Sequence, residues 1–127
     1  MSRGCLILVC CGVALFTVGI RKARSHAFPE RAEPRVGATV EIAPDQVQIW
    51  FNSVLEAAFS HIRVDTASGE RIDKGNDHVD SKQSTLLTVD LPPLAPGTYH
   101  VIWSVMARDG HHTEGKYTFT VKQRSSP

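Results

Sequence analysis

Three side chains that can bind a metal or carry a proton lie close together near the end of the chain. Asp109, His111 and His112 surround Gly110 and precede residues 116–121, where apolar and polar side chains alternate as in a half-buried strand. In an extended chain, residues two apart face the same way, so Asp109 and His111 would point together and His112 would point to the opposite face. A carboxylate and an imidazole paired in this way form a compact two-ligand unit for a borderline metal.

The preceding segment decides how this pair would be presented. Residues 98–107 have the pattern of a strong strand, with one inward row formed by Tyr99, Val101, Trp103 and Val105. If the strand continues, Asp109 and His111 prolong that row beyond the core. The alternative is an ordinary β-turn, because Asp-Gly is a favoured turn pair. A metal site also needs a third ligand from elsewhere in the chain.

The N-terminal region offers that ligand through processing. An apolar run at residues 5–20 has the length of a signal-peptide core and is short for a membrane span. Ala23 and Ser25 occupy the small-residue positions of a signal-peptidase cut before His26. We therefore expect residues 1–25 to be a cleaved signal peptide. An uncleaved membrane anchor is the alternative, since the basic residues that follow the run oppose export.

A histidine at the start of the mature chain would be a chelating residue. Its free amine and its ring Nδ1 can bind one metal together, and His111 would add a third nitrogen. With the carboxylate of Asp109, this N,O set suits Cu(II), whereas zinc prefers a tetrahedron with thiolates or three histidines. Cu(I) prefers sulfur, and Met106 is the only sulfur-containing residue after the proposed cut at His26.

Length and composition restrict the other possibilities. The chain has 127 residues, which predicts one domain, and its formal net charge is +1. No basic stripe follows the N-terminal segment, so nucleic acid is not an expected partner. All three cysteines lie within the apolar run, and the remaining chain therefore has neither a disulfide nor a thiolate ligand. No motif for a catalytic nucleophile or a small-molecule substrate is present.

The remaining chain predicts an all-β fold. Short strands are expected at residues 46–52, 60–66, 85–91, 98–107 and 116–121. A tight turn at Ser68-Gly69 leads into a return strand at residues 70–73, and residues 75–84 form a polar loop. Gly115 bounds the last strand, and residues 55–60 could form one helical turn. Six or seven short strands indicate a single Greek-key β-sandwich or barrel of about seven strands, immunoglobulin-like or cupredoxin-like.

Several motifs resemble those of the CopC family of periplasmic copper-binding proteins. They are the "HA" after the proposed cut, "LAPGTYHVIW" and "DGH" before "GKYTFTV", and the resemblance covers His26 to about Lys122. It implies a seven-stranded Greek-key sandwich, a role in copper homeostasis or resistance, and one Cu(II) per chain. The ligands it implies are His26, Asp109 and His111. It also implies periplasmic localisation and a CopD-like inner-membrane partner protein.

This sequence departs from the family pattern in two places. Ser53 stands where family members often carry an acid near the copper, so Glu56, three residues on, is a candidate accessory ligand. His112, the neighbour of His111, is a second candidate accessory ligand. The loop at residues 70–84 has no methionine, and the second, cuprous site of some members is therefore not expected.

Three functions remain open at this stage. The leading one is a monomeric, non-enzymatic copper carrier or buffer formed by residues 26–127. A copper-dependent oxidative enzyme is the second, because lytic polysaccharide monooxygenases also use an N-terminal histidine chelate. The third is a metal-free interaction domain for a CopD-like membrane protein.

Overall fold

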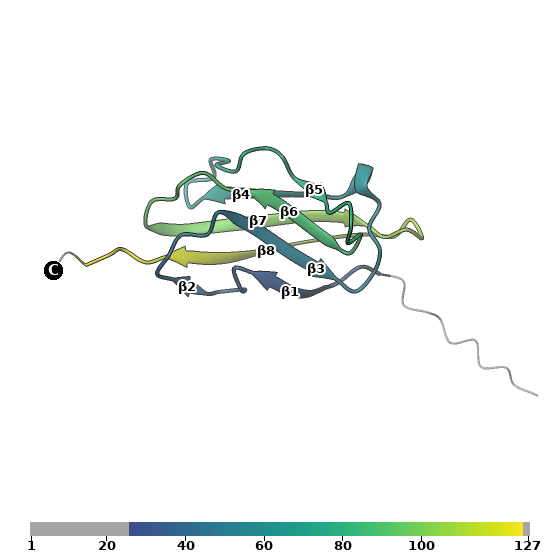
Figure 1. Ribbon diagram of the computed structural model, residues 1–127, viewed down its shortest axis with the longest axis horizontal. Helices are drawn as coiled ribbons and strands as arrows, with labels where there is room; N and C mark the ends of the chain where they lie inside the picture. Colours follow the sequence, from purple (N-terminus) through teal and green to yellow (C-terminus); the bar gives the residue numbers. More distant parts are fainter. Residues whose placement is uncertain (1–25, 126–127) are drawn as a thin grey trace, which may run out of the picture.

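The computed structural model describes residues 26–125, which form two stacked four-stranded sheets (Figure 1). One sheet has the strand order β1-β3-β6-β5 and the other β2-β8-β7-β4. All pairings are antiparallel except β2 with β8. The elements of this region are β1 (Pro29–Glu33), β2 (Thr39–Val40), β3 (Gln46–Phe51), η1 (Ala57–Phe59), β4 (His61–Thr66), β5 (His78–Val79), β6 (Leu86–Asp90), β7 (Gly97–Met106) and β8 (His112–Val121).

The predicted all-β sandwich is confirmed. The described residues contain eight strands where about seven were expected, because β2 and β5 have only two residues each. The non-sequential strand orders in both sheets are those of a Greek-key sandwich. The only helical element in residues 26–125 is η1, a single 3₁₀ turn within the segment where one helical turn was expected.

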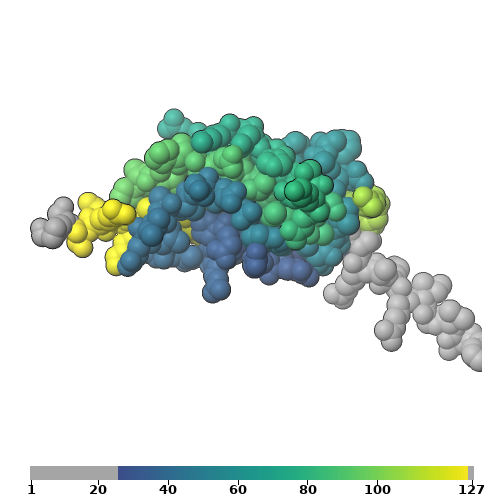
Figure 2. Space-filling view, in the orientation of Figure 1, coloured from purple at the N-terminus to yellow at the C-terminus, as the bar shows by residue number. Residues whose placement is uncertain are grey.

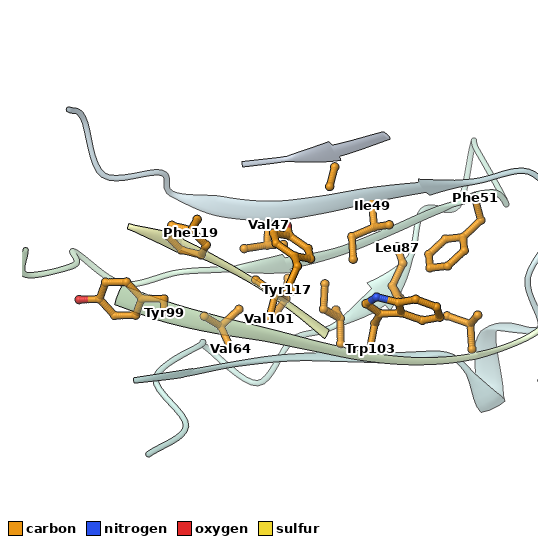
Figure 3. Close-up of a cluster of buried hydrophobic side chains, with 14 of the residues drawn as sticks. Val47, Ile49, Phe51, Val64, Leu87, Tyr99, Val101, Trp103, Tyr117 and Phe119 are labelled. Atoms are coloured by element: carbon orange, nitrogen blue, oxygen red, sulfur yellow. The ribbon is translucent and has the colours of Figure 1, made fainter. Parts of the chain in front are cut away.

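The core lies between the sheets and is built from the predicted inward rows. Figure 3 shows these side chains meeting from β3, β4, β6, β7 and β8. Trp103 meets the edge of Phe51 with ring centroids 5.2 Å apart, and Tyr99 stacks on Phe119 at 5.5 Å. Each inward row is fully or almost fully buried. Burial of this apolar surface is the main favourable contribution to the folding free energy of a cysteine-free domain of this size.

The hairpin of β7 and β8 is the longest pairing and extends from Gly97↔Val121 to Met106↔His112. Gly115 was expected to bound the last strand, but it lies inside β8, opposite Trp103. A Cβ built at Gly115 would lie 2.8 Å from Cε2 of the indole, so the glycine makes room for the ring. The long hairpin carries its turn beyond the core at one end of the sandwich.

Other local expectations also change. The segment at residues 70–73 forms a single bridge, Asp65↔Arg71, rather than a strand. The loop at residues 75–84 contains β5, which pairs with β6. The strands β1 and β2 were not expected from the sequence. In β1 only Ala32 is buried, so the strand has no alternation of apolar and polar residues, and β2 has too few residues to show such a pattern.

A buried carboxylate closes the outer edge of β4. Asp73, whose side chain has no exposed surface, accepts hydrogen bonds from the backbone N–H of Val64 at 2.8 Å and of Gly75 at 2.8 Å. The Arg71 guanidinium lies 2.9 Å from the same carboxylate. Burial alone would raise the pKa of Asp73, but these hydrogen bonds and the adjacent charge outweigh it and lower the pKa.

The proposed signal segment, residues 1–25, and its cut before His26 lie outside the described residues. Within residues 26–125, no helix reaches the length and apolar character that crossing a membrane requires.

Candidate metal site

The segment that carries the acid and the two histidines is the turn between β7 and β8. The strand β7 ends at Met106 and does not continue through Asp109 as the extended arrangement required. The backbone N–H of Gly110 donates to the carbonyl of Ala107 at 2.9 Å, and Gly110 has φ +90°, a left-handed conformation suited to glycine. The Asp-Gly pair is therefore a hairpin turn, and the prediction of a shared strand face for the acid and the imidazole was wrong.

The turn nevertheless joins Asp109 to His111 by a different geometry. Oδ1 of Asp109 accepts the backbone N–H of His111 at 3.0 Å, and Oδ2 lies 2.7 Å from its ring Nδ1. A carboxylate only accepts hydrogen bonds, so Nδ1 is the protonated nitrogen in this pair. In the neutral imidazole, Nε2 of His111 then carries the lone pair, which is the arrangement found in carboxylate–histidine–metal units.

The ring of His26 lies next to the ring of His111. Its ring centroid is 4.7 Å from that of His111, with the planes inclined at 72°. The two residues come from opposite ends of the described chain and meet at one end of the sandwich, where the start of β1 and the β7–β8 turn lie together (Figure 1). The space-filling view shows the β7–β8 turn, in yellow-green, at the surface of this end of the molecule (Figure 2). Both imidazoles are exposed to solvent.

The backbone next to His26 is held in place by two residues that the sequence did not single out. The hydroxyl of Thr113 donates to the carbonyl of Ala27 at 2.7 Å, and the side chain of Ala27 is fully buried. Asn52 accepts the backbone N–H of Phe28 at 2.8 Å, and its own N–H donates to the Phe28 carbonyl at 3.0 Å. No local sequence motif marks these two residues as important, because Thr113 lies 86 residues from Ala27 and Asn52 lies 24 residues from Phe28.

The candidate accessory residues lie in different surroundings. His112 faces the outer side of its sheet, as predicted, and its Nε2 lies 2.6 Å from the Ser104 hydroxyl. The backbone N–H of Glu56 donates to the Met106 carbonyl at 2.8 Å, beside the turn. Among the described residues, no hydrogen bond or ion pair joins the Glu56 carboxylate to either imidazole of the candidate site.

The side-chain donors at this end are thus two imidazoles and one carboxylate already engaged with His111. Residues 26–125 contain no group of three or more His, Cys, Asp or Glu side chains arranged to hold a metal ion.

Several known proteins are similar to this chain in sequence and fold. The CopC domain profile matches residues 30–122. Protein YobA of Escherichia coli is 36% identical over 102 residues, which cover 77% of this chain and 80% of YobA. The copper transport protein CutJ of Bacillus subtilis is 29% identical over 109 residues, covering 84% of this chain. Because those residues are 20% of CutJ, the chain spans about a fifth of that relative.

The crystal structure of CopC from Methylosinus trichosporium is similar in fold, with a TM-score of 0.70 and 33% sequence identity. The superposition covers 80% of this chain and 99% of that structure. The profile match and the shared sandwich together show that this protein belongs to the CopC family.

Proposed function

We propose that this protein binds one Cu(II) ion per chain at the end of the sandwich where His26 and His111 meet. The observation that carries the proposal is the 4.7 Å separation of these two imidazoles, contributed by segments far apart in the sequence. Membership of the CopC family and the similarity to a protein named for copper transport support copper as the metal.

The proposed ligands are three nitrogens. Cleavage between Ser25 and His26 would free an α-amine that chelates Cu(II) together with Nδ1 of the same residue. His111 would bind through Nε2, because its Nδ1 is engaged by Asp109 at 2.7 Å. Such a tetragonal nitrogen set is one that Cu(II) favours.

Asp109 would act mainly through His111 rather than as a strong ligand. Both of its oxygens accept hydrogen bonds from that residue, which fixes the orientation and the tautomer of the ring. Glu56 and His112 are not included in the proposed ligand set. His112 faces the outer side of the sheet and pairs with Ser104, and the contact of Glu56 beside the turn is made by its backbone N–H.

The proposed role is that of a non-catalytic, monomeric copper carrier or buffer in the exported compartment, the periplasm, serving copper homeostasis or resistance. A CopD-like membrane protein is the proposed partner. In CutJ, the region matching this chain is a fifth of a longer copper transport protein, so a CopC-like region can work together with further parts of such a protein.

Metal analysis of the purified domain starting at His26 tests this function. After incubation with Cu(II) and removal of unbound metal, we expect one copper per chain, together with an electron paramagnetic resonance spectrum of nitrogen-ligated Cu(II). A protein that retains no copper, or retains zinc in preference, would contradict the proposal.

A further inference from the structure

The residue after the proposed chelate is unusually well fixed for a position so close to the chain start. The Ala27 side chain is fully buried and its carbonyl accepts the Thr113 hydroxyl at 2.7 Å. The next residue, Phe28, is bound through both its N–H and its carbonyl by Asn52. Only the backbone and side-chain torsions of His26 itself remain to be set.

Thr113 connects this fixed segment to the strand that carries the second imidazole. It lies two residues after His111, at the start of β8, and pairs with Val105, which is fully buried. One hydroxyl therefore ties the chain start to the ligand-bearing turn across 86 residues of sequence. With an anchor on each side, the fold sets the distance between the backbone segments that carry the two imidazoles.

We infer that Thr113 is a positioning residue for the copper site, which rests on the function proposed above. Its hydroxyl donates to the Ala27 carbonyl and not to either imidazole. Its hydrogen bond holds the carbonyl of Ala27, the residue after His26, and would thereby keep the freed amine and the ring Nδ1 close to His111 before the metal binds. Without this hydrogen bond, the first residues would have to become ordered when Cu(II) binds, and this ordering would reduce the net free energy of binding.

Replacing Thr113 by valine keeps the shape and removes the hydroxyl, while serine keeps the hydroxyl. In the protein that starts at His26, we expect Thr113→Val to weaken Cu(II) binding about 10- to 100-fold, the range typical of residues that orient a metal ligand. Thr113→Ser should restore most of the affinity. Thr118→Val, the same change on the outer row of the same strand, should leave it unchanged.

Testing Thr113→Val in a second protein, one without the amine chelate, separates a role in positioning His26 from a general effect on folding. In a protein carrying one extra glycine before His26, the amine chelate is absent, so Thr113→Val should have little additional effect on Cu(II) affinity. An equal loss in both backgrounds would mean that the substitution acts through the fold, and would overturn the inference.

A measurement without metal keeps the inference testable if copper fails to bind. In the metal-free protein, NMR should detect a nuclear Overhauser effect between the rings of His26 and His111, retained in Thr113→Ser and lost in Thr113→Val. Persistence of that effect in Thr113→Val would overturn the positioning role. Failure of the unsubstituted protein to bind copper would instead contradict the proposed function.

Discussion

The ring Nδ1 of His111 lies 2.7 Å from Oδ2 of Asp109, and the same aspartate accepts the backbone N–H of His111 through its other oxygen. This pair sets the order in which substitutions should damage the site. His111→Ala removes a nitrogen ligand and should weaken Cu(II) binding by orders of magnitude. Asp109→Ala removes the group that orients the ring and should cost about 10- to 100-fold. Copper titration against a competing chelator would measure both losses, and a larger loss in Asp109→Ala would contradict this assignment.

His112 offers a matched comparison, because it is the neighbouring imidazole on the outer face. His112→Ala should leave Cu(II) affinity within about twofold, since its hydrogen bond to Ser104 points it away from His26. The same titration applies. If His112→Ala proved damaging and His111→Ala silent, the site would have to be rebuilt around His112.

Asp73 should make a pH-dependent contribution to stability. Its pKa is lowered in the folded state, so its contribution is present above the unfolded value of about 3.9 and is lost as the pH falls through the folded pKa. Asp73→Asn should lower the free energy of unfolding by about 1–3 kcal/mol at pH 7, because it weakens buried hydrogen bonds.

Urea unfolding at pH 7 and at acidic pH would test this effect. The difference between Asp73→Asn and the unsubstituted protein should shrink as the pH falls. Asp45→Asn, a change at an exposed position, should be nearly neutral at both pH values. A difference for Asp73→Asn that grew on acidification would contradict the assignment.

Gly115 should tolerate no side chain. Gly115→Ala would drive a methyl group into the Trp103 indole and should lower the free energy of unfolding by about 1–3 kcal/mol, with altered tryptophan fluorescence. Glu114→Ala, at the adjacent exposed position, serves as the control. Unchanged stability in Gly115→Ala would mean that the ring has room to move.

The sequence predicted the sandwich and its inward rows because alternation is a local property. Val47, Ile49 and Phe51, for example, follow the period of a strand whose inner face is buried, and all three are in the core. The strand β1 lacked that signal, since it lies at a sheet edge with one buried residue. Its pairing with β3 depends on tertiary contacts that local pattern does not encode.

The ligand identities stay a prediction, and the geometry expected for the pair of Asp109 and His111 differs from the one observed. Sequence pattern brought Asp109 and His111 together on an extended strand, whereas a hairpin turn with Gly110 at positive φ does so in the structure. The contributions of Asn52 and Thr113 could not be predicted, because each depends on a contact between segments brought together only by folding.

The central claim depends on where the mature chain begins. N-terminal sequencing of exported protein should read His-Ala-Phe, since Ala23 and Ser25 occupy the positions that signal peptidase recognises. A start at any other residue would remove the amine chelate.

The most direct test is a Cu(II) titration of two proteins that differ by one glycine before His26. The extra residue converts the free amine to an amide and leaves every side chain in place. We predict that the protein starting at His26 binds one Cu(II) tightly, and that the extended protein binds it more weakly by orders of magnitude, as His111→Ala does. Equal affinity in the two proteins would contradict the N-terminal chelate.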